Sequence, residues 1–202
     1  MQEELITLLA GRRGHFQMES GYHSERWFNL DTLFSQPDRL RPFVAELARR
    51  LAVHRIDCVC GPMTGGAKLA ELIAAELGVG FFFTERYAPS PSDAAAGGLF
   101  PIKYLLPAAR RAAVRGKLVA IVDDAVSAGS AARGTHADLI ACAARPVALG
   151  AMFVFGEGAA RFAREKNLAL ESIAQMSFGC WAPAECPLCR NGIALEKVSD
   201  AI

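Results

Sequence analysis

One stretch of thirteen residues, Val119 to Ala131, constrains this chain more than any other. It reads VAIVDDAVSAGSA: four apolar residues, then Asp123 and Asp124, then two apolar residues and a run of small ones. The apolar run predicts a buried strand. The small residues predict a tight loop at the start of a helix, where backbone N–H groups and the helix dipole favour an anion. We therefore expect a strand that ends in two acids and leads into an anion-binding loop.

Strand and helix patterns alternate along the rest of the chain. Helical spacing of apolar residues predicts helices over 2–12, 38–54, 67–78, 130–144 and 158–167. Short apolar runs predict strands over 56–60, 79–85, 117–124, 145–155 and 168–176, with a further extended segment over 99–107. Strands that alternate with helices favour parallel order and right-handed crossovers. We therefore predict an α/β fold with a doubly wound, mostly parallel sheet.

The domain organisation is expected to be simple. The chain has 202 residues, and no internal repeat or linker divides it. An aromatic-rich stretch over about 12–35 and the C-terminal tail over 177–202 are expected to form a small hood on a single domain that spans 1–202.

Charge and hydropathy exclude several classes of partner. The net charge is only +1, so no overall field attracts nucleic acid or an anionic membrane. No apolar run approaches the roughly 20 residues of a membrane-spanning helix. The first residues place acids before a short apolar segment, unlike a secretory signal. We expect a cytoplasmic protein without a nucleic-acid or membrane partner.

The acid pair allows several roles. Ligands of open α/β sheets bind beyond the carboxyl ends of the strands, where Asp123 and Asp124 fall. Adjacent carboxylates there can accept hydrogen bonds from the hydroxyls of a ribose or hold a hydrated Mg²⁺ ion. A purely structural pair that caps the following helix is the alternative.

The whole thirteen-residue stretch closely resembles the phosphoribosyl-pyrophosphate (PRPP) motif of type I phosphoribosyltransferases. The resemblance implies that Asp123 and Asp124 are catalytic residues that contact the ribose hydroxyls, and that Ser127 to Ala131 hold the 5-phosphate. It also implies Mg²⁺ as cofactor. The implied PRPP-binding residues are Arg86, Asp123, Asp124, Ala125, Val126, Ser127, Ala128, Gly129, Ser130 and Ala131.

Three further segments resemble orotate phosphoribosyltransferases: GHFQMESGYHSERWFN at 14–29, CGPMTGGAKLA at 60–70, and the tail WAPAECPLCRNGIALEKV at 181–198. This resemblance implies a glycosyltransferase that moves the 5-phosphoribosyl group from PRPP to orotate, giving orotidine 5′-phosphate and pyrophosphate for pyrimidine biosynthesis. It implies a homodimer, and it implies that Trp27, Phe28 and Ser127 contact the base.

The chain departs from the family pattern at several positions. Residues 87–98, expected to close over the site, contain no Lys or His, which leaves Arg86 before them and Lys103 after them as candidate cations; Lys103 is the third candidate catalytic residue. Gly65 and Glu19 stand where lysines are frequent in the family, and no Arg is evident near Phe155, Gly156 and Glu157 at the end of the strand after the motif's helix. Two alternatives therefore stay open: a phosphoribosyltransferase for another nucleobase, and a non-catalytic regulatory protein that binds PRPP.

The cysteines and histidines give no metal site by spacing. Cys186-Pro-Leu-Cys189 has the turn of half a zinc knuckle, but no second cysteine pair completes it. Free thiols, or a metal completed by a second subunit, are both compatible with this tail, which also contains Cys180. The four histidines show no spacing typical of a metal site or a catalytic dyad, and no metal ligand is predicted among them: His15, His23, His54 and His136.

Overall fold

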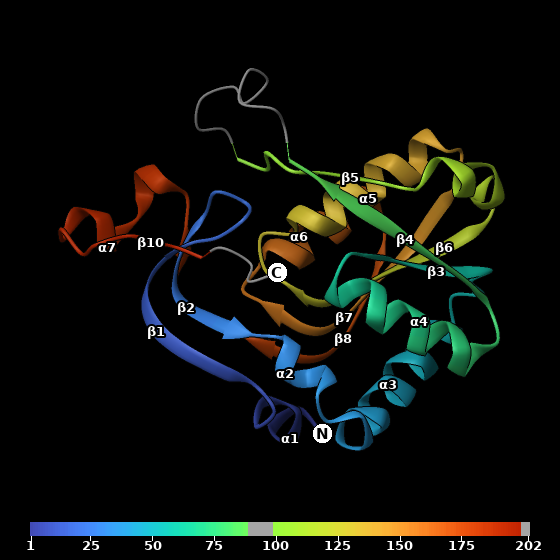
Figure 1. Cartoon of the computed structure of the whole chain (residues 1–202), viewed down its shortest axis with the longest axis horizontal. Coiled ribbons are helices and arrows are strands. Elements are labelled where there is room, and N and C mark those ends of the chain that lie inside the picture. Colours follow the sequence, from blue (N-terminus) through green and yellow to red (C-terminus); the bar gives the residue numbers. More distant parts are fainter. Residues whose placement is uncertain (89–98, 199–202) are drawn as a thin grey trace.

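The central sheet has six strands in the order β5-β4-β3-β6-β7-β8 (Figure 1). This computed structural model describes residues 1–88 and 99–198. The strands are β3 (Cys58–Pro62), β4 (Gly80–Tyr87), β5 (Lys103–Leu105), β6 (Leu118–Val126), β7 (Arg145–Phe155) and β8 (Ala169–Met176). Neighbouring strands from β4 to β8 are parallel, and β5 is antiparallel to β4. The predicted α/β fold with a mostly parallel sheet is confirmed.

Helices cover both faces of this sheet. One apolar core involves α1 (Gln2–Ile6), α2 (Asp31–Phe34), α3 (Pro37–Ala52) and α4 (Gly65–Leu77). The other involves α5 (Ser130–Ala141), α6 (Gly158–Lys166) and a 3₁₀ segment, η1 (Ala108–Val114). Strand β6 shows why two cores form: Ala120 and Val122 point into the first, and Val119 and Ile121 into the second. The apolar run is thus buried on both faces, as a central parallel strand requires.

A second, four-stranded sheet in the order β10-β1-β2-β9 joins distant parts of the chain. We call it the hood sheet. Its strands are β1 (Ala10–Gln17), β2 (His23–Asn29), β9 (Cys180–Trp181) and β10 (Glu196–Lys197). Between the last two lie the 3₁₀ turn η2 (Pro183–Glu185) and the short helix α7 (Pro187–Arg190). In Figure 1 this sheet stands on the opposite side of the molecule from α4.

The predicted helix over 2–12 is wrong after Ile6, because β1 begins at Ala10. Glycine is a poor helix former, and residues 11 and 14 are both glycine. In the strand these glycines allow close packing: a Cβ atom on Gly11 would lie 2.5 Å from the ring of Phe28, and one on Gly14 would lie 2.6 Å from that of Phe16. Tight ring packing across the hood sheet therefore takes precedence over the short helical pattern.

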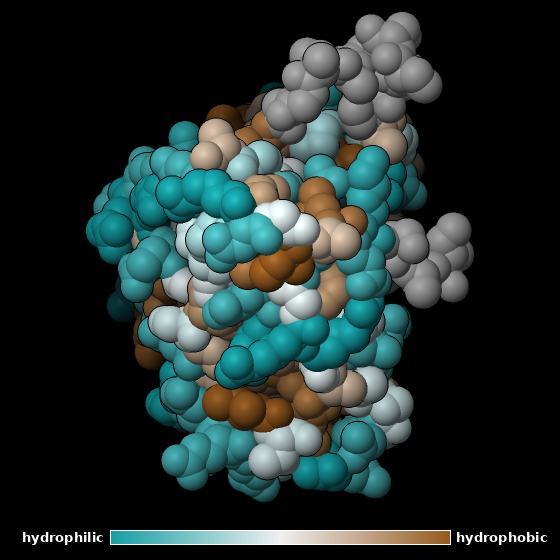
Figure 2. Space-filling model, turned by 90° about the vertical axis from the view of Figure 1, so that its left-hand side faces the viewer, coloured by the Kyte–Doolittle hydropathy of each residue, from teal (hydrophilic) through white to brown (hydrophobic). Residues whose placement is uncertain are grey.

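None of the helices within residues 1–88 and 99–198 combines the length and apolar character needed to span a membrane. Hydrophilic side chains dominate the face on the hood-sheet side, with several separate hydrophobic areas among them (Figure 2). Most of the 87–98 segment that was expected to close over the site lies outside the described residues.

Candidate functional site

Asp123 and Asp124 lie near the carboxyl end of β6, the first buried and the second half-buried. Oδ1 of Asp123 accepts a 3.1 Å hydrogen bond from the N–H of Asp124, and Oδ1 of Asp124 accepts one of 2.8 Å from the N–H of Ala125. Burial and the adjacent Asp124 carboxylate raise the pKa of Asp123 well above its usual value. Burial also raises the pKa of Asp124. Two crowded acids of this kind favour a ligand that donates hydrogen bonds or carries positive charge.

The loop after the acid pair forms a small cavity of about 140 Å³ at the start of α5. Gly129 precedes the helix with φ of 83°, a left-handed conformation that suits glycine, and no side chain caps the helix. The first backbone N–H groups of α5 can therefore bind an anion. The cavity is lined by Met18, Glu19, Ser20, Asp123, Ala125, Val126, Ser127, Ala128, Gly129, Ser130 and Ala131. Every predicted PRPP-binding residue except Arg86 and Asp124 is among them.

Two glycines at the start of α4 lie against the acid pair. A Cβ atom on Gly65 would lie 1.8 Å from Oδ2 of Asp124, and one on Gly66 would lie 2.7 Å from Oδ1 of Asp123. Any side chain at position 65 would therefore displace the Asp124 carboxylate. This contact gives a physical reason for glycine rather than lysine at position 65.

Glu19, at the tip of the β1–β2 hairpin, connects the hood sheet to the cavity. Its Oε2 accepts a 2.7 Å hydrogen bond from Nε of Arg86, and its Oε1 accepts one of 2.6 Å from the hydroxyl of Tyr104. The hydroxyl of Ser130, in the first turn of α5, lies 3.4 Å from the same Oε1. Glu19 thus holds Arg86 beside the anion-binding loop. Sequence reasoning missed Tyr104, because nothing in its extended segment indicates a polar partner.

A larger cavity of about 460 Å³ adjoins the first and shares Ser127 and Ala128 with it. Its aromatic lining residues are Tyr22, Phe100, Phe155 and Phe178, and its charged ones are Arg133, Glu157, Arg161 and Glu165. Such walls suit a flat ring that carries polar substituents.

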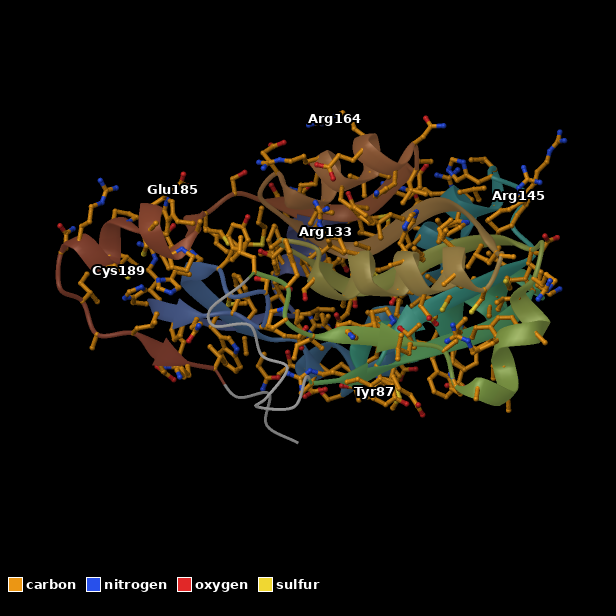
Figure 3. The ribbon with its side chains drawn as sticks, turned by 90° about the horizontal axis from the view of Figure 1, so that it is seen from above. Tyr87, Arg133, Arg145, Arg164, Glu185 and Cys189 are labelled. Atoms are coloured by element: carbon orange, nitrogen blue, oxygen red, sulfur yellow. The ribbon has the colours of Figure 1, made fainter. Side chains whose placement is uncertain are left out.

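The two arginines of this cavity differ in their surroundings. In Figure 3 Arg133 lies between the hood sheet and the helices. Its guanidinium stands 4.6 Å from the ring centre of Phe162 and pairs with Glu165 at 3.2 Å. Arg161 is exposed.

The predicted base-binding residues are placed differently from one another. Ser127 lies between the two cavities, but Trp27 and Phe28 line neither. Phe28 is half-buried, stacks on Phe155 with ring centres 5.1 Å apart and packs against the core. Trp27 faces the opposite way, with the guanidinium of Arg12 5.4 Å from its ring centre, because adjacent strand residues point to opposite faces.

Lys103 lies exposed on β5, next to Tyr104. Since Tyr104 is directed toward Glu19, the side chain of Lys103 points to the other face of the strand. Its catalytic role stays a prediction.

No protein-family profile matches the chain. It is 31% identical over 191 residues to the orotate phosphoribosyltransferase of Heliobacterium modesticaldum, which covers 91% of this chain and 88% of that protein. The chain belongs to the orotate phosphoribosyltransferase family. A second orotate phosphoribosyltransferase, from Caldanaerobacter subterraneus, is 29% identical over 185 residues, 92% of this chain and 88% of that one.

Solved structures share the fold of this orotate phosphoribosyltransferase family member. Orotate phosphoribosyltransferase from Aeropyrum pernix superposes with a TM-score of 0.61 at 20% identity, covering 86% of this chain and 93% of that one. Adenine phosphoribosyltransferase from Rhodothermus marinus gives a TM-score of 0.67 at 15% identity, covering 87% and 98%. The expected type I phosphoribosyltransferase fold is therefore confirmed.

Proposed function

We propose that this protein transfers the 5-phosphoribosyl group from PRPP to orotate, giving orotidine 5′-phosphate and pyrophosphate. The observation that carries the proposal is the shared wall of Ser127 and Ala128 between the two cavities. An anion and a pair of ribose hydroxyls fit the smaller cavity, and a flat ring fits the larger one. The two reacting groups then meet across one loop, as a transfer between them requires.

The smaller cavity supplies the parts that a phosphoribosyl donor needs. The N–H groups at the start of α5 bind the 5-phosphate, and Asp123 and Asp124 accept hydrogen bonds from the ribose hydroxyls. The same carboxylates are hard oxygen donors whose crowding a divalent cation relieves, so they fit Mg²⁺. An ion held by these carboxylates would supply positive charge beside the leaving pyrophosphate.

The reaction is a displacement at the anomeric carbon of the ribose. A ring nitrogen of the base loses its proton to solvent and forms the new bond, while the bond to pyrophosphate breaks and its electrons leave with the pyrophosphate. Arg86 stabilises that negative charge, and Glu19 holds the guanidinium in place through its 2.7 Å hydrogen bond. Lys103 is proposed as a second cation.

The larger cavity is proposed to bind the base. Its aromatic side chains surround the flat ring, and exposed Arg161 is the candidate partner of the orotate carboxylate. Arg133 serves this purpose less well, because Glu165 already pairs with it. Trp27 and Phe28 are proposed to affect base binding only indirectly. Phe28 stacks on Phe155, which lines the cavity.

A panel of bases tests this proposal. Pyrophosphate release is measured with PRPP, Mg²⁺ and either orotate, uracil, adenine, guanine or hypoxanthine. Turnover with orotate is expected, and the double variant Asp123→Asn/Asp124→Asn should abolish it while the protein stays folded. Turnover of a purine but not of orotate would overturn the choice of base. PRPP binding by calorimetry without turnover of any base would favour a regulatory protein instead.

One observation favours a different base as the second candidate. Residues 155–157, at the end of β7, are Phe, Gly and Glu, so the cavity receives an acid there rather than a cation. A base that carries an exocyclic amine would match Glu157 better than a carboxylate does. The same panel separates the two candidates.

We also propose that the chain forms one domain, works as a homodimer in the cytoplasm and uses no nucleic-acid partner. The family resemblance supports the dimer, and the net charge of +1 fits a small-molecule enzyme. Size-exclusion chromatography with light scattering tests the dimer: a single peak at the monomer mass contradicts it.

A further inference from the structure

Two histidines of the hood sheet and two cysteines of the C-terminal tail converge on one point. His15 lies on β1, His23 begins β2, and Cys186 and Cys189 lie at the turn into and within α7. One nitrogen or sulfur atom from each lies within 4.8 Å of all the others. The first three residues are buried, and Cys189 is exposed at the edge of the tail (Figure 3).

Four of the six distances between these atoms are close to the edges of a tetrahedral metal site. Nε2 of His15 lies 3.1 Å from Nδ1 of His23, 3.4 Å from Sγ of Cys186 and 3.6 Å from Sγ of Cys189. Sγ of Cys189 lies 3.2 Å from Nδ1 of His23. Zn–N bonds of about 2.0–2.1 Å and Zn–S bonds of about 2.3 Å give tetrahedral edges of roughly 3.3–3.8 Å. The four printed distances differ from these edges by a few tenths of an ångström at most, and the other two pairs lie within 4.8 Å.

Hydrogen bonding alone does not account for this cluster. Nδ1 of His15 donates a hydrogen bond of 2.8 Å to the carbonyl oxygen of Ile193, so this nitrogen carries the ring proton. Nε2 is then left with one lone pair, although His23, Cys186 and Cys189 all face it. A cation between them accepts a lone pair from every one of these atoms. The Ile193 carbonyl acts as the outer partner that orients a metal-bound histidine.

We propose that His15, His23, Cys186 and Cys189 bind one structural Zn²⁺ ion. The two thiols release their protons to solvent on binding, and the two thiolates balance the charge of the ion beside two neutral imidazoles. Four protein ligands leave no open position, which is the arrangement of structural zinc, and two nitrogen with two sulfur donors in a tetrahedron suit this metal.

The proposed ion ties the tail to the hairpin that reaches the candidate active site. His15 and His23 flank the turn whose tip carries Glu19 and Tyr22, and the two cysteines belong to the tail between β9 and β10. The strand contacts of β9 and β10 with the hood sheet involve only two residue pairs each. The metal therefore supplies a fixed connection where backbone pairing is short.

Spacing along the chain did not reveal this site, and the expectation that no histidine belongs to a metal cluster is revised by the geometry. The hairpin and the tail each contribute only two ligands. The pairing of β1 with β10 and of β2 with β9 brings them together. The second pair of ligands that the cysteine tail lacked comes from the chain's own hairpin rather than from a second subunit.

Metal analysis of the intact protein tests the proposal. Elemental mass spectrometry of protein purified without chelator is expected to find one zinc ion per chain. Cys189→Ser and His23→Gln should each lose most of it, whereas the matched controls Cys142→Ser and His54→Gln, both outside the cluster, should keep it. Wild-type protein that is free of zinc and takes up none from a zinc-buffered solution overturns the proposal.

X-ray absorption at the zinc edge gives a second measurement that needs no variant. Two sulfur atoms at about 2.3 Å and two nitrogen atoms at about 2.0–2.1 Å are expected around the ion. A shell of oxygen and nitrogen alone, or a Cys186–Cys189 disulfide in the intact mass, contradicts the site. Neither measurement uses a substrate, so their outcome is independent of the proposed enzymatic activity.

Discussion

The Nε atom of Arg86 lies 2.7 Å from Oε2 of Glu19, and this pair joins β4 to the tip of the hood hairpin beside the α5 N-terminus. The carboxylate positions the cation, but it also brings a negative charge close to the place proposed for an anionic substrate. Glu19 therefore has two opposing effects on the same site.

The first prediction concerns this pair. Arg86→Gln should raise the KM for PRPP by about tenfold or more, since a charge-assisted hydrogen bond is worth about 1.5–3 kcal/mol. Glu19→Gln should lower that KM because it removes a negative charge, and lower kcat because Arg86 is no longer held. Steady-state kinetics of the single and double variants measures both effects. If the free-energy changes calculated from KM and kcat for the two single variants add up to that of the double variant, the ion pair has no role in the reaction.

The acid pair gives a second prediction. Burial and Asp124 raise the pKa of Asp123, so its charge at neutral pH destabilises the folded state relative to the unfolded one. Asp123→Asn should therefore melt no lower than the wild type while PRPP affinity falls about tenfold or more, as expected when a hydrogen bond to a charged group is lost. Calorimetry with PRPP and thermal melting check the two parts. Unchanged affinity would show that the pair is structural.

Gly65 gives a third prediction. A Cβ atom there would lie 1.8 Å from Oδ2 of Asp124, so Gly65→Ala should move that carboxylate and weaken PRPP binding. Gly78→Ala is the matched control: Gly78 ends α4 with φ of 65° and has open space around it. It should cost about 1–2 kcal/mol of stability and leave the KM unchanged. Equal KM values for both variants would contradict the role of Gly65.

A fourth prediction separates the base from the donor. Arg161→Gln should raise the KM for orotate about tenfold and leave PRPP affinity unchanged, because Arg161 lines only the larger cavity. Arg164→Gln, on the same helix, is the control; Arg164 lines neither cavity and lies at the outer edge of the molecule (Figure 3). The same change in both variants would point to general charge rather than a specific contact.

His136 gives a fifth prediction, on stability and pH. Burial lowers its pKa, and its ring stands edge-on to Phe162 with ring centres 5.6 Å apart. The unfolded chain then binds the proton more readily, so the stability contributed by neutral His136 is present above its unfolded pKa and is lost as pH falls below about 6.5. His136→Gln should flatten the loss of melting temperature between pH 7.5 and pH 5.5, compared with wild type and with His54→Gln. An unchanged slope would contradict this assignment.

The sequence contained enough information for the sheet and the anion-binding loop, because both depend on local pattern. An apolar run, two acids and small residues are adjacent in the chain, and the backbone places them together wherever β6 lies. The fold class followed from the alternation of strands and helices in the same way.

Features that depend on distant contacts could not be predicted. Trp27 contacts Arg12 on one face of β2 while Phe28 packs against the core on the other, and only the pairing of β1 with β2 sets those faces. Likewise Tyr104 and Glu19 meet through the folding of the hairpin over α5. The four-residue His and Cys cluster required both ends of the hood sheet.

The strand order of the hood sheet also determines when its strands can pair during synthesis on the ribosome. Strand β1 pairs with β10, and β2 with β9, so the β1–β2 hairpin lacks both outer neighbours until residues 180–197 have been synthesised. The central sheet ends at Met176 and can assemble before that. The hairpin therefore has two unpaired edges while residues 30–179 are synthesised, and chain segments this far apart in sequence pair slowly. Unpaired strand edges are open to aggregation or to chaperones, so these two strands are vulnerable in the nascent chain.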